Sequence, residues 1–435
     1  MGCDLDKVLI SSSQSNFNKR LGELRIEVCE AATFGPGSDK GMKVARIIED
    51  IRTHGDEGVA RYTQEFDNVR LTVEEFLVSS AELQRAHATI DKELLKSIRR
   101  AIKNVRKYQE EIFVADKNTH PGIRYNPIRR IGICVPGASA PLPSTVIMTA
   151  APAQVAGVKE IAVVSPPRHK GSIHPVTLGT CHELGINEVY RIGGVQAVAA
   201  LAYGTDKIKR VDKIAGPGNQ WVQTAKRLVY GSVGIDSVAG PSEVLIIANE
   251  QANPAWIAAD MLSQAEHAPG SAVVVTDSQE LAEKILSQLK KQVEELDRAE
   301  PTRECLSKSS GIVVFANIVE AVEWANEFAT EHLQIFCGDK SREISEQIEN
   351  AGAVFIGAYS PAAVGDYWAG PSHTLPTGGA ARFCSGLTSN DFVKSTSIIE
   401  YDREKLAESA ADIIRLAETE GLDAHARSIR IRLQD

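Results

Sequence analysis

Three short stretches carry side chains whose types and spacing suit metal-assisted proton transfer. Gln264 and His267 lie three positions apart at the end of an apolar run, so a helix there would present both on one face. Glu331 and His332 are adjacent, which brings both into one pocket only where a helix ends and a strand begins. Asp366 follows a glycine in "VGDYW". Each of these patterns also occurs in ordinary helices and turns.

Two further histidines lie in conspicuous settings, His373 in "GPSHTLP" and His425 in "GLDAHARS". A single histidine is more often a hydrogen-bonded structural residue than a metal ligand. The Glu331–His332 pair has the stronger functional claim, because ligands of parallel sheets collect where the chain reverses. These residues therefore leave both a catalytic pocket and ordinary structural roles open.

Two glycine-rich turns, "RIGGVQA" (191–197) and "AGPGNQ" (215–220), each follow a strand-like run and open a helix-like one. Free backbone N–H groups and the helix dipole can hold a phosphate at such a junction. Glycine turns are also common there for steric reasons, and GxGxxG occurs at none of the junctions. The turns alone leave a cofactor role open.

The elements that must position these residues read as alternating strands and helices. From about residue 131 onward, apolar runs such as "EIAVVS" (160–165) and "SEVLIIAN" (242–249) alternate with helical segments at the spacing of βαβ units. This pattern predicts two open parallel sheets covered by helices on both faces. Residues 31–120 read as charged helices with a break at Gly55, and a glycine-rich segment (365–386) leads into a helical tail.

Length and composition exclude several classes of protein. A chain of 435 residues is too long for one hydrophobic core, so two or more domains are expected. The net charge of -9 disfavours nucleic-acid binding, and no apolar stretch approaches the length of a membrane span. The N-terminal residues 1–20 lack an apolar core long enough for a signal peptide. The seven cysteines are scattered without a CxxC pair, which favours a reducing, cytoplasmic location over a disulfide framework.

Taken together, eight segments in order make the chain similar to the histidinol dehydrogenase family over nearly its whole length. They are "VPGASAPLPSTVIM" (135–148), "GGVQAVAALAYGT" (193–205), "KIAGPGN" (213–219), "AGPSEVLI" (239–246), "SQAEH" (263–267), "TEHLQI" (330–335), "SPAAVGDYWAGPSHTLPT" (360–377) and "EGLDAHARSIRIR" (420–432). The resemblance implies two Rossmann-like parallel-sheet domains, a small N-terminal segment and a helical C-terminal tail. We expect the boundaries 1–30 for the segment, 31–133 with 244–387 for the first domain, 134–243 for the second, NAD-contacting domain, and 388–435 for a dimerisation tail.

The resemblance also implies one zinc per subunit and two NAD molecules used in sequence to oxidise L-histidinol through its aldehyde to the acid. The implied zinc ligands are Gln264, His267, Asp366 and His425. A nitrogen and oxygen ligand set suits a metal that holds and polarises a substrate, and redox-inert zinc leaves the electrons to NAD. By the same resemblance, His332 is the general base for the alcohol and Glu331 activates the water that attacks the aldehyde.

Further positions match family residues that contact the substrate or the cofactor. Ser242, His373 and Glu420 match substrate contacts, to which His332 and the four zinc ligands also belong. Gln196 and Asn219 match NAD contacts. The chain departs from the family pattern at a third such position, where Cys134 replaces the usual tyrosine and Ala138 follows in "VPGA". Loss of the aromatic ring predicts weaker cofactor binding rather than a changed reaction.

The resemblance implies a homodimer in which Glu420 and His425 of the tail reach the partner's site, with no nucleic-acid or membrane partner. A tail packed on its own subunit is the alternative. Three other functions remain open: a related dehydrogenase of another small polar alcohol, a zinc hydrolase that uses Glu331, and a non-catalytic binding protein. Loss of hydride transfer in a His332→Asn variant separates the first dehydrogenase hypothesis from the binding protein.

Overall fold

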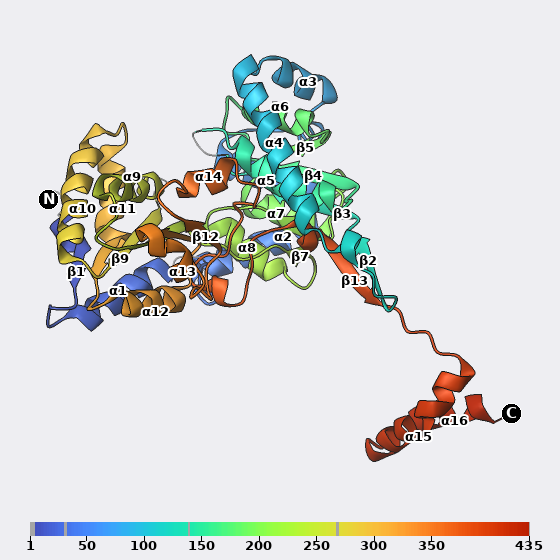
Figure 1. Cartoon of the computed structure of the whole chain (residues 1–435). Helices are drawn as coiled ribbons and strands as arrows, with labels where there is room; N and C mark the ends of the chain where they lie inside the picture. Colours follow the sequence, from blue (N-terminus) through green and yellow to red (C-terminus); the bar gives the residue numbers. More distant parts are fainter. Residues whose placement is uncertain (1–4, 30–32, 138–139, 267–268, 435) are drawn as a thin grey trace. The chain divides into compact units, whose positions relative to one another are not determined.

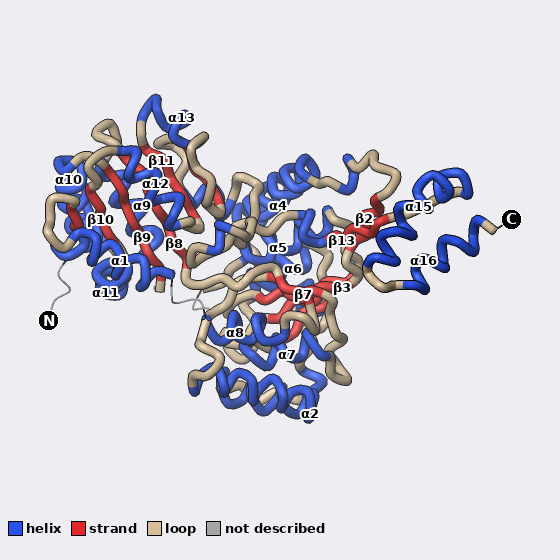
Figure 2. Tube along the Cα trace, turned by 90° about the horizontal axis from the view of Figure 1, so that it is seen from below, coloured by secondary structure: helices blue, strands red, loops and turns tan. Residues whose placement is uncertain are grey.

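Two open parallel sheets carry the larger part of the chain (Figures 1 and 2). The computed structural model describes residues 5–29, 33–137, 140–266 and 269–434. The first sheet has six strands in the order β1-β10-β9-β8-β11-β12, with all neighbours parallel. Their bounds are β1 Leu9–Ser11, β8 Ser242–Ala248, β9 Gly270–Thr276, β10 Gly311–Val314, β11 His332–Phe336 and β12 Ala353–Ile356.

Helices cover both faces of the six-stranded sheet, which explains its unbroken apolar runs. Along β8, Val244 and Ile246 face one core, and Leu245 and Ile247 face the other. The helices on the Val244 side are α9 Pro254–Ala265, α10 Gln279–Gln292 and α11 Ala299–Ser309. Those on the Leu245 side are α1 Phe17–Cys29, α12 Ile318–Phe328 and the short α13 Ser341–Ser345. Helix α14 Ala362–Tyr367 follows β12 in the chain.

The second sheet has five parallel strands in the order β5-β4-β3-β6-β7. Its first strand in sequence is central, so the direction of winding reverses between β3 and β6, as in doubly wound nucleotide-binding folds. The strands are β3 Arg130–Cys134, β4 Glu160–Val164, β5 Glu188–Tyr190, β6 Lys213–Ala215 and β7 Gly234–Ile235. The connecting helices are α5 Pro143–Val155, α6 Pro175–Glu183, α7 Gly194–Tyr203 and α8 Gln220–Val229.

The N-terminal third contributes a strand to one sheet and covering helices to the other. Strand β1 pairs with β10, so the expected separate segment 1–30 contributes an edge strand to the six-stranded sheet. Helices α2 Asp39–Asp67, α3 Ser80–Ala88 and α4 Lys92–Ile112 pack on α7, α6 and α5, although we expected residues 31–133 to group with the other sheet. Gly55 interrupts α2 with φ 50°, which confirms the expected break. The domain boundaries themselves stay a prediction.

Residues 114–126 and 393–435 form a separate unit. Strands β2 Ile123–Pro127 and β13 Val393–Ser397 pair, and α15 Arg403–Thr419 packs on α16 Asp423–Arg430. The tail expected to be helical over 388–435 forms α-helix only from residue 403, because residues 393–397 form strand β13. The short 389–392 turn before it belongs to the larger unit.

Membrane-spanning helices and disulfide bonds were not expected from the sequence, and both points can be examined in the part of the chain that the structure describes. None of the helices there is long and apolar enough to span a membrane. Cys134, Cys181, Cys305, Cys337 and Cys384 are free thiols.

Candidate active site

The predicted catalytic pair, Glu331 and His332, lies at the amino ends of strands in the six-stranded sheet. Helix α12 stops at Phe328, and its cap Ala329 adopts the left-handed conformation with φ 54°. Strand β11 then begins at His332, whose register partner on β8 is Val244. Glu331 and His332 therefore fall where the helix gives way to the strand, as the sequence predicted, and both line one pocket.

Glu331 is held by the start of β8. Its Oε2 accepts hydrogen bonds from the hydroxyl of Ser242 at 2.6 Å and from the backbone N–H of Glu243 at 2.8 Å. The other oxygen, Oε1, accepts no hydrogen bond from the residues that the structure describes, and the residue as a whole is only 6 % exposed. One carboxylate oxygen is thus fixed and the other remains available to a proton donor.

His332 is oriented by hydrogen bonding and by charge. Its Nδ1 lies 3.1 Å from the carbonyl oxygen of Glu243, so Nδ1–H donates there and Nε2 is the reactive atom of the neutral ring. Nε2 lies 3.5 Å from Asp366 Oδ1. Burial disfavours the charged ring, but the carboxylates of Glu331 and Asp366 outweigh it and raise the pKa of His332 well above its usual value.

The pocket around this pair has a volume of about 250 Å³. Ser242, Asp366 and His373 line it together with Glu331 and His332, so five residues predicted from distant parts of the sequence are brought together. Burial lowers the pKa of His373, which keeps its ring neutral at pH 7. Pro136 and Pro217, from turns that follow strands of the five-stranded sheet, close the opposite wall.

Gln264 approaches the same edge of the sheet. It lies in the last turn of α9, and His332 and Phe336 share the strand face that packs against this helix. Its amide Nε2 is buried and has no hydrogen-bond partner among the described residues, and a Cβ on Gly270 would lie 3.5 Å from it. Gly270 is the register partner of Ser242. An unpartnered amide N–H at this edge of the sheet suits donation to a substrate oxygen, whereas a metal would be bound by the amide oxygen instead.

The other implied zinc ligands are not brought together by the structure. His267 lies outside the described residues, and His425 lies with Glu420 in the smaller unit, where both are exposed. No cluster of three or more His, Cys, Asp or Glu side chains suited to a metal occurs within the described ranges. The zinc set therefore stays a prediction.

A nucleotide-sized crevice opens at the carboxyl ends of the five-stranded sheet. A pocket of about 240 Å³ is lined by Cys134 at the end of β3, Gly193 after β5 and Asn219 after β6, at the reversal point where doubly wound sheets bind dinucleotides. Asn219 caps α8 by accepting hydrogen bonds from the N–H groups of Trp221 and Val222. This crevice shares Pro136 and Pro217 with the catalytic pocket.

Gln196 has the chemistry of a cofactor contact. It is fully buried in the first turns of α7, and neither its amide oxygen nor its amide nitrogen has a partner among the described residues. The amide oxygen would lie 2.9 Å from a Cβ placed on Gly194, a glycine with φ 68° that lines the crevice. Cys134, by contrast, is inert, because burial raises the pKa of its thiol to about 12.

A buried ion pair that the sequence did not reveal supports the glycine turn of this crevice. Lys226 and Asp236 are bonded to each other with side chains 1 % and 3 % exposed. Lys226 Nζ donates a hydrogen bond to the carbonyl oxygen of Gly216 at 3.0 Å, and the backbone N–H of Gly216 donates to Asp236 Oδ2 at 2.7 Å. Both polar groups of Gly216 are thus fixed. Lysine inside an amphipathic helix gives no sign in the sequence that it will be buried.

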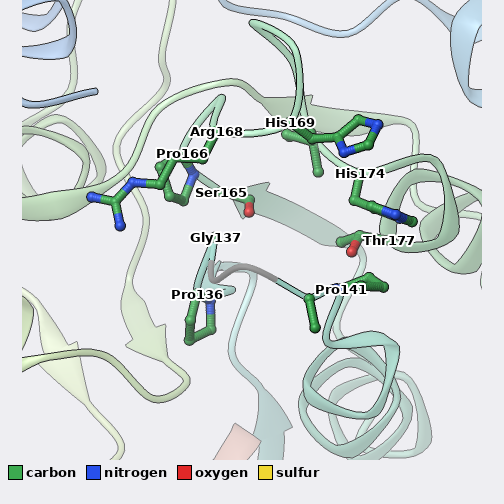
Figure 3. A pocket seen from close by; sticks show the side chains of 11 residues that line it. Pro136, Gly137, Pro141, Ser165, Pro166, Arg168, His169, His174 and Thr177 are labelled. Atoms are coloured by element: carbon green, nitrogen blue, oxygen red, sulfur yellow. The ribbon is translucent and has the colours of Figure 1, made fainter. Parts of the chain in front are cut away.

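A second polar pocket of about 260 Å³ adjoins the crevice at the carboxyl end of β4 (Figure 3). Pro136, Pro141, Ser165 and Thr177 line this pocket, and His174, which caps α6, lies beside Thr177 (Figure 3). Pro136, Gly137, Pro166 and Arg168 line both this pocket and the crevice. The crevice and this pocket therefore extend together along the carboxyl ends of four strands, β3, β4, β5 and β6.

The whole chain is similar to one family of known proteins. The family model described as histidinol dehydrogenase matches residues 37–433. Relatives named histidinol dehydrogenase include one from Rhodopirellula baltica, 48% identical over 92% of this chain and 88% of its own, and one from Geobacillus kaustophilus, 44% identical over 95% and 99%. A solved histidinol dehydrogenase from Elizabethkingia anophelis is 34% identical with a TM-score of 0.88, covering 98% of both chains.

Proposed function

Because the chain belongs to the histidinol dehydrogenase family, we propose that it oxidises L-histidinol to L-histidine, the last steps of histidine biosynthesis, with two NAD⁺ and one zinc. The observation that carries this proposal is that two pockets adjoin each other. One contains two side chains able to act as bases, Glu331 and His332, and the other is a crevice at the point where the winding of a doubly wound sheet reverses. An acid–base pair next to a dinucleotide site suits oxidation by hydride transfer.

The first oxidation converts the alcohol to the aldehyde. His332 Nε2 takes the hydroxyl proton, and an NAD⁺ held in the crevice would accept the hydride from the adjacent carbon, so one proton and one hydride are removed in all. The hydrogen bond from Nδ1–H to Glu243 O holds the ring with Nε2 toward the pocket. The base must begin unprotonated, and a cation held by Asp366 would remove part of the negative charge that raises the pKa of His332.

The second oxidation converts the aldehyde to the carboxylate. Water adds to the carbonyl carbon as Glu331 Oε1 takes one of its protons, which gives the anion of the aldehyde hydrate. A second NAD⁺ held in the crevice would accept the hydride from that carbon, which leaves the carboxylic acid, and loss of the acid's proton gives the carboxylate. The added water supplies the second oxygen of the carboxylate. The two oxidations together remove four electrons from the substrate.

The predicted zinc ligands Gln264, His267, Asp366 and His425 would hold a metal that polarises the substrate oxygen. Substrate contacts at Ser242, His373 and Glu420 remain part of the proposal, as do cofactor contacts at Cys134, Gln196 and Asn219. Ser242 and His373 line the pocket, and Cys134 and Asn219 line the crevice. We also propose a cytoplasmic homodimer in which Glu420 and His425 complete the partner's site.

The alternatives explain the structure less completely. A zinc hydrolase needs Glu331 but leaves the nucleotide-type crevice and the unpartnered Gln196 without a role. A dehydrogenase of another polar alcohol fits both pockets, and only the substrate distinguishes it from the leading proposal.

His332→Asn and Glu331→Gln test the assigned roles. His332→Asn is expected to lower kcat for the first hydride transfer by about 100-fold or more, with L-histidinol binding retained, because general bases typically contribute that much. Glu331→Gln should instead slow oxidation of supplied L-histidinal. Stopped-flow NADH absorbance measures both steps, and calorimetry measures binding. Unchanged hydride transfer in His332→Asn would contradict the assignment.

A further inference from the structure

The glutamate that follows Ser242 has no step in the mechanism above, yet it is more deeply buried than either reactive residue. Glu243 is 1 % exposed in a strand whose following residues are all apolar. Placing a carboxyl there costs solvation free energy that an aliphatic side chain would not cost. Such a cost indicates a role that an apolar residue cannot supply.

The two glutamates hold each other's backbone. Glu243 Oε1 accepts hydrogen bonds from the N–H of Glu331 at 3.2 Å and from the N–H of Gly378 at 2.9 Å. In return, the N–H of Glu243 donates to Glu331 Oε2 at 2.8 Å, and the carbonyl oxygen of Glu243 accepts from His332 Nδ1. One residue therefore contacts the backbone of Glu331, its carboxylate and the imidazole ring.

Burial, and then the charge of Glu331, raise the pKa of Glu243 to about 8. Glu243 is consequently uncharged at pH 7 and adds no second negative charge beside Glu331. A neutral acceptor of this shape can fix the neighbouring backbone without repelling its carboxylate.

We propose that Glu243 is a positioning residue for the water-activating step, fixing Glu331 so that Oε1 faces the pocket. This inference rests on the proposed function, because it requires Glu331 to be the base for water. Loss of the Glu243 acceptor frees the N–H groups of Glu331 and Gly378, and the carboxylate of Glu331 then loses its single orientation. Oxidation of the aldehyde should suffer more than oxidation of the alcohol.

The decisive comparison is between Glu243→Gln and Glu243→Met in the full-length, zinc-loaded protein. Glutamine keeps the Oε1 acceptor without charge, whereas methionine fills a similar volume and accepts no hydrogen bond of comparable strength. Glu188→Gln is the matched control, since Glu188 is a half-buried glutamate of β5 that pairs with Arg130 at the opposite end of its sheet from the crevice. NADH formation is followed separately with L-histidinol in a single turnover and with supplied L-histidinal.

We expect Glu243→Met to lower kcat for L-histidinal by about 100-fold and the first hydride transfer by less than about threefold. Glu243→Gln should restore the wild-type ratio of the two rates, and Glu188→Gln should leave that ratio unchanged. If Glu243→Met is not recovered folded, Glu243→Asp carries the test, because the shortened side chain withdraws the acceptor.

Equal slowing of both steps by Glu243→Met, or the same selective loss in Glu243→Gln, would overturn the inference. The wild-type protein separates this outcome from failure of the proposed function. Wild-type protein without NADH formation from either substrate overturns both proposals, whereas normal wild-type turnover with an unchanged ratio in Glu243→Met overturns only the role of Glu243.

Discussion

At the residue scale, the buried carboxyl of Glu243 makes stability depend on pH. Its pKa in the folded protein is about 8, above the ordinary value of 4.5, so its contribution is fully present below pH 4.5 and is lost as pH rises through 8. Glu243→Gln removes this dependence. The free energy of unfolding of the wild type should therefore fall relative to that of Glu243→Gln by a few kcal/mol between pH 5 and pH 9, on the order expected for such a shift.

Urea unfolding at pH 5, 7 and 9 measures this difference. Parallel stability curves for the two proteins would show that Glu243 titrates normally and would remove the reason to treat it as uncharged.

Gly216, which directly precedes the crevice residues Pro217 and Gly218, has no room for a side chain. Its φ is 107°, and an added Cβ would lie 2.3 Å from the carbonyl oxygen of Cys134. Gly216→Ala is expected to weaken NAD⁺ binding at least tenfold by displacing the turn. Gly185→Ala is the control, because Gly185 also has positive φ, 72°, but nothing lies within 4 Å of its added Cβ. That control should cost only about 1 kcal/mol of backbone strain.

Titration of NAD⁺ against each variant, with thermal unfolding alongside, separates the steric effect from strain. Equal NAD⁺ affinity in both variants would mean that the Gly216 turn does not shape the crevice.

At the scale of elements, the ion pair between α8 and the end of β7 fixes the turn of the crevice. Lys226→Met leaves the Asp236 carboxylate buried without its partner, which typically costs about 3–5 kcal/mol. Lys226→Met with Asp236→Leu removes both charges and should recover much of this loss in denaturant unfolding. NAD⁺ affinity should fall in both variants, because the Gly216 carbonyl loses its donor. Full recovery of affinity in the double variant would contradict a positioning role.

The elements also show what the sequence could predict. Both sheets were predictable, because strands such as β8 and β9 are covered on both faces and read as apolar runs. The interruption of α2 followed from Gly55. The packing of α2–α4 on the five-stranded sheet was not predictable, since amphipathic helices show which face is buried and not against what. Glu243 was missed because its bonds to Glu331 depend on a register between strands 88 residues apart.

At the scale of the whole molecule, the proposed dimer predicts complementation between two inactive variants. If the tail of one subunit completes the site of the other, mixing His425→Asn with His332→Asn protein gives heterodimers with one intact site. Random subunit exchange makes half of the dimers mixed, so activity should return to about a quarter of the wild type. Each variant incubated alone is the control. No recovered activity after demonstrated exchange would show that the tail serves its own subunit.

The proposed zinc-dependent, four-electron oxidation of L-histidinol with NAD⁺ at one site is tested most directly by the ratio of NADH formed to L-histidinol consumed. Zinc-loaded protein is compared with chelator-treated protein and with chelated protein to which zinc is restored. We expect two NADH per L-histidinol, loss of this activity on chelation and its return with zinc. One NADH per substrate with free aldehyde accumulating, or turnover unaffected by chelation, would contradict it.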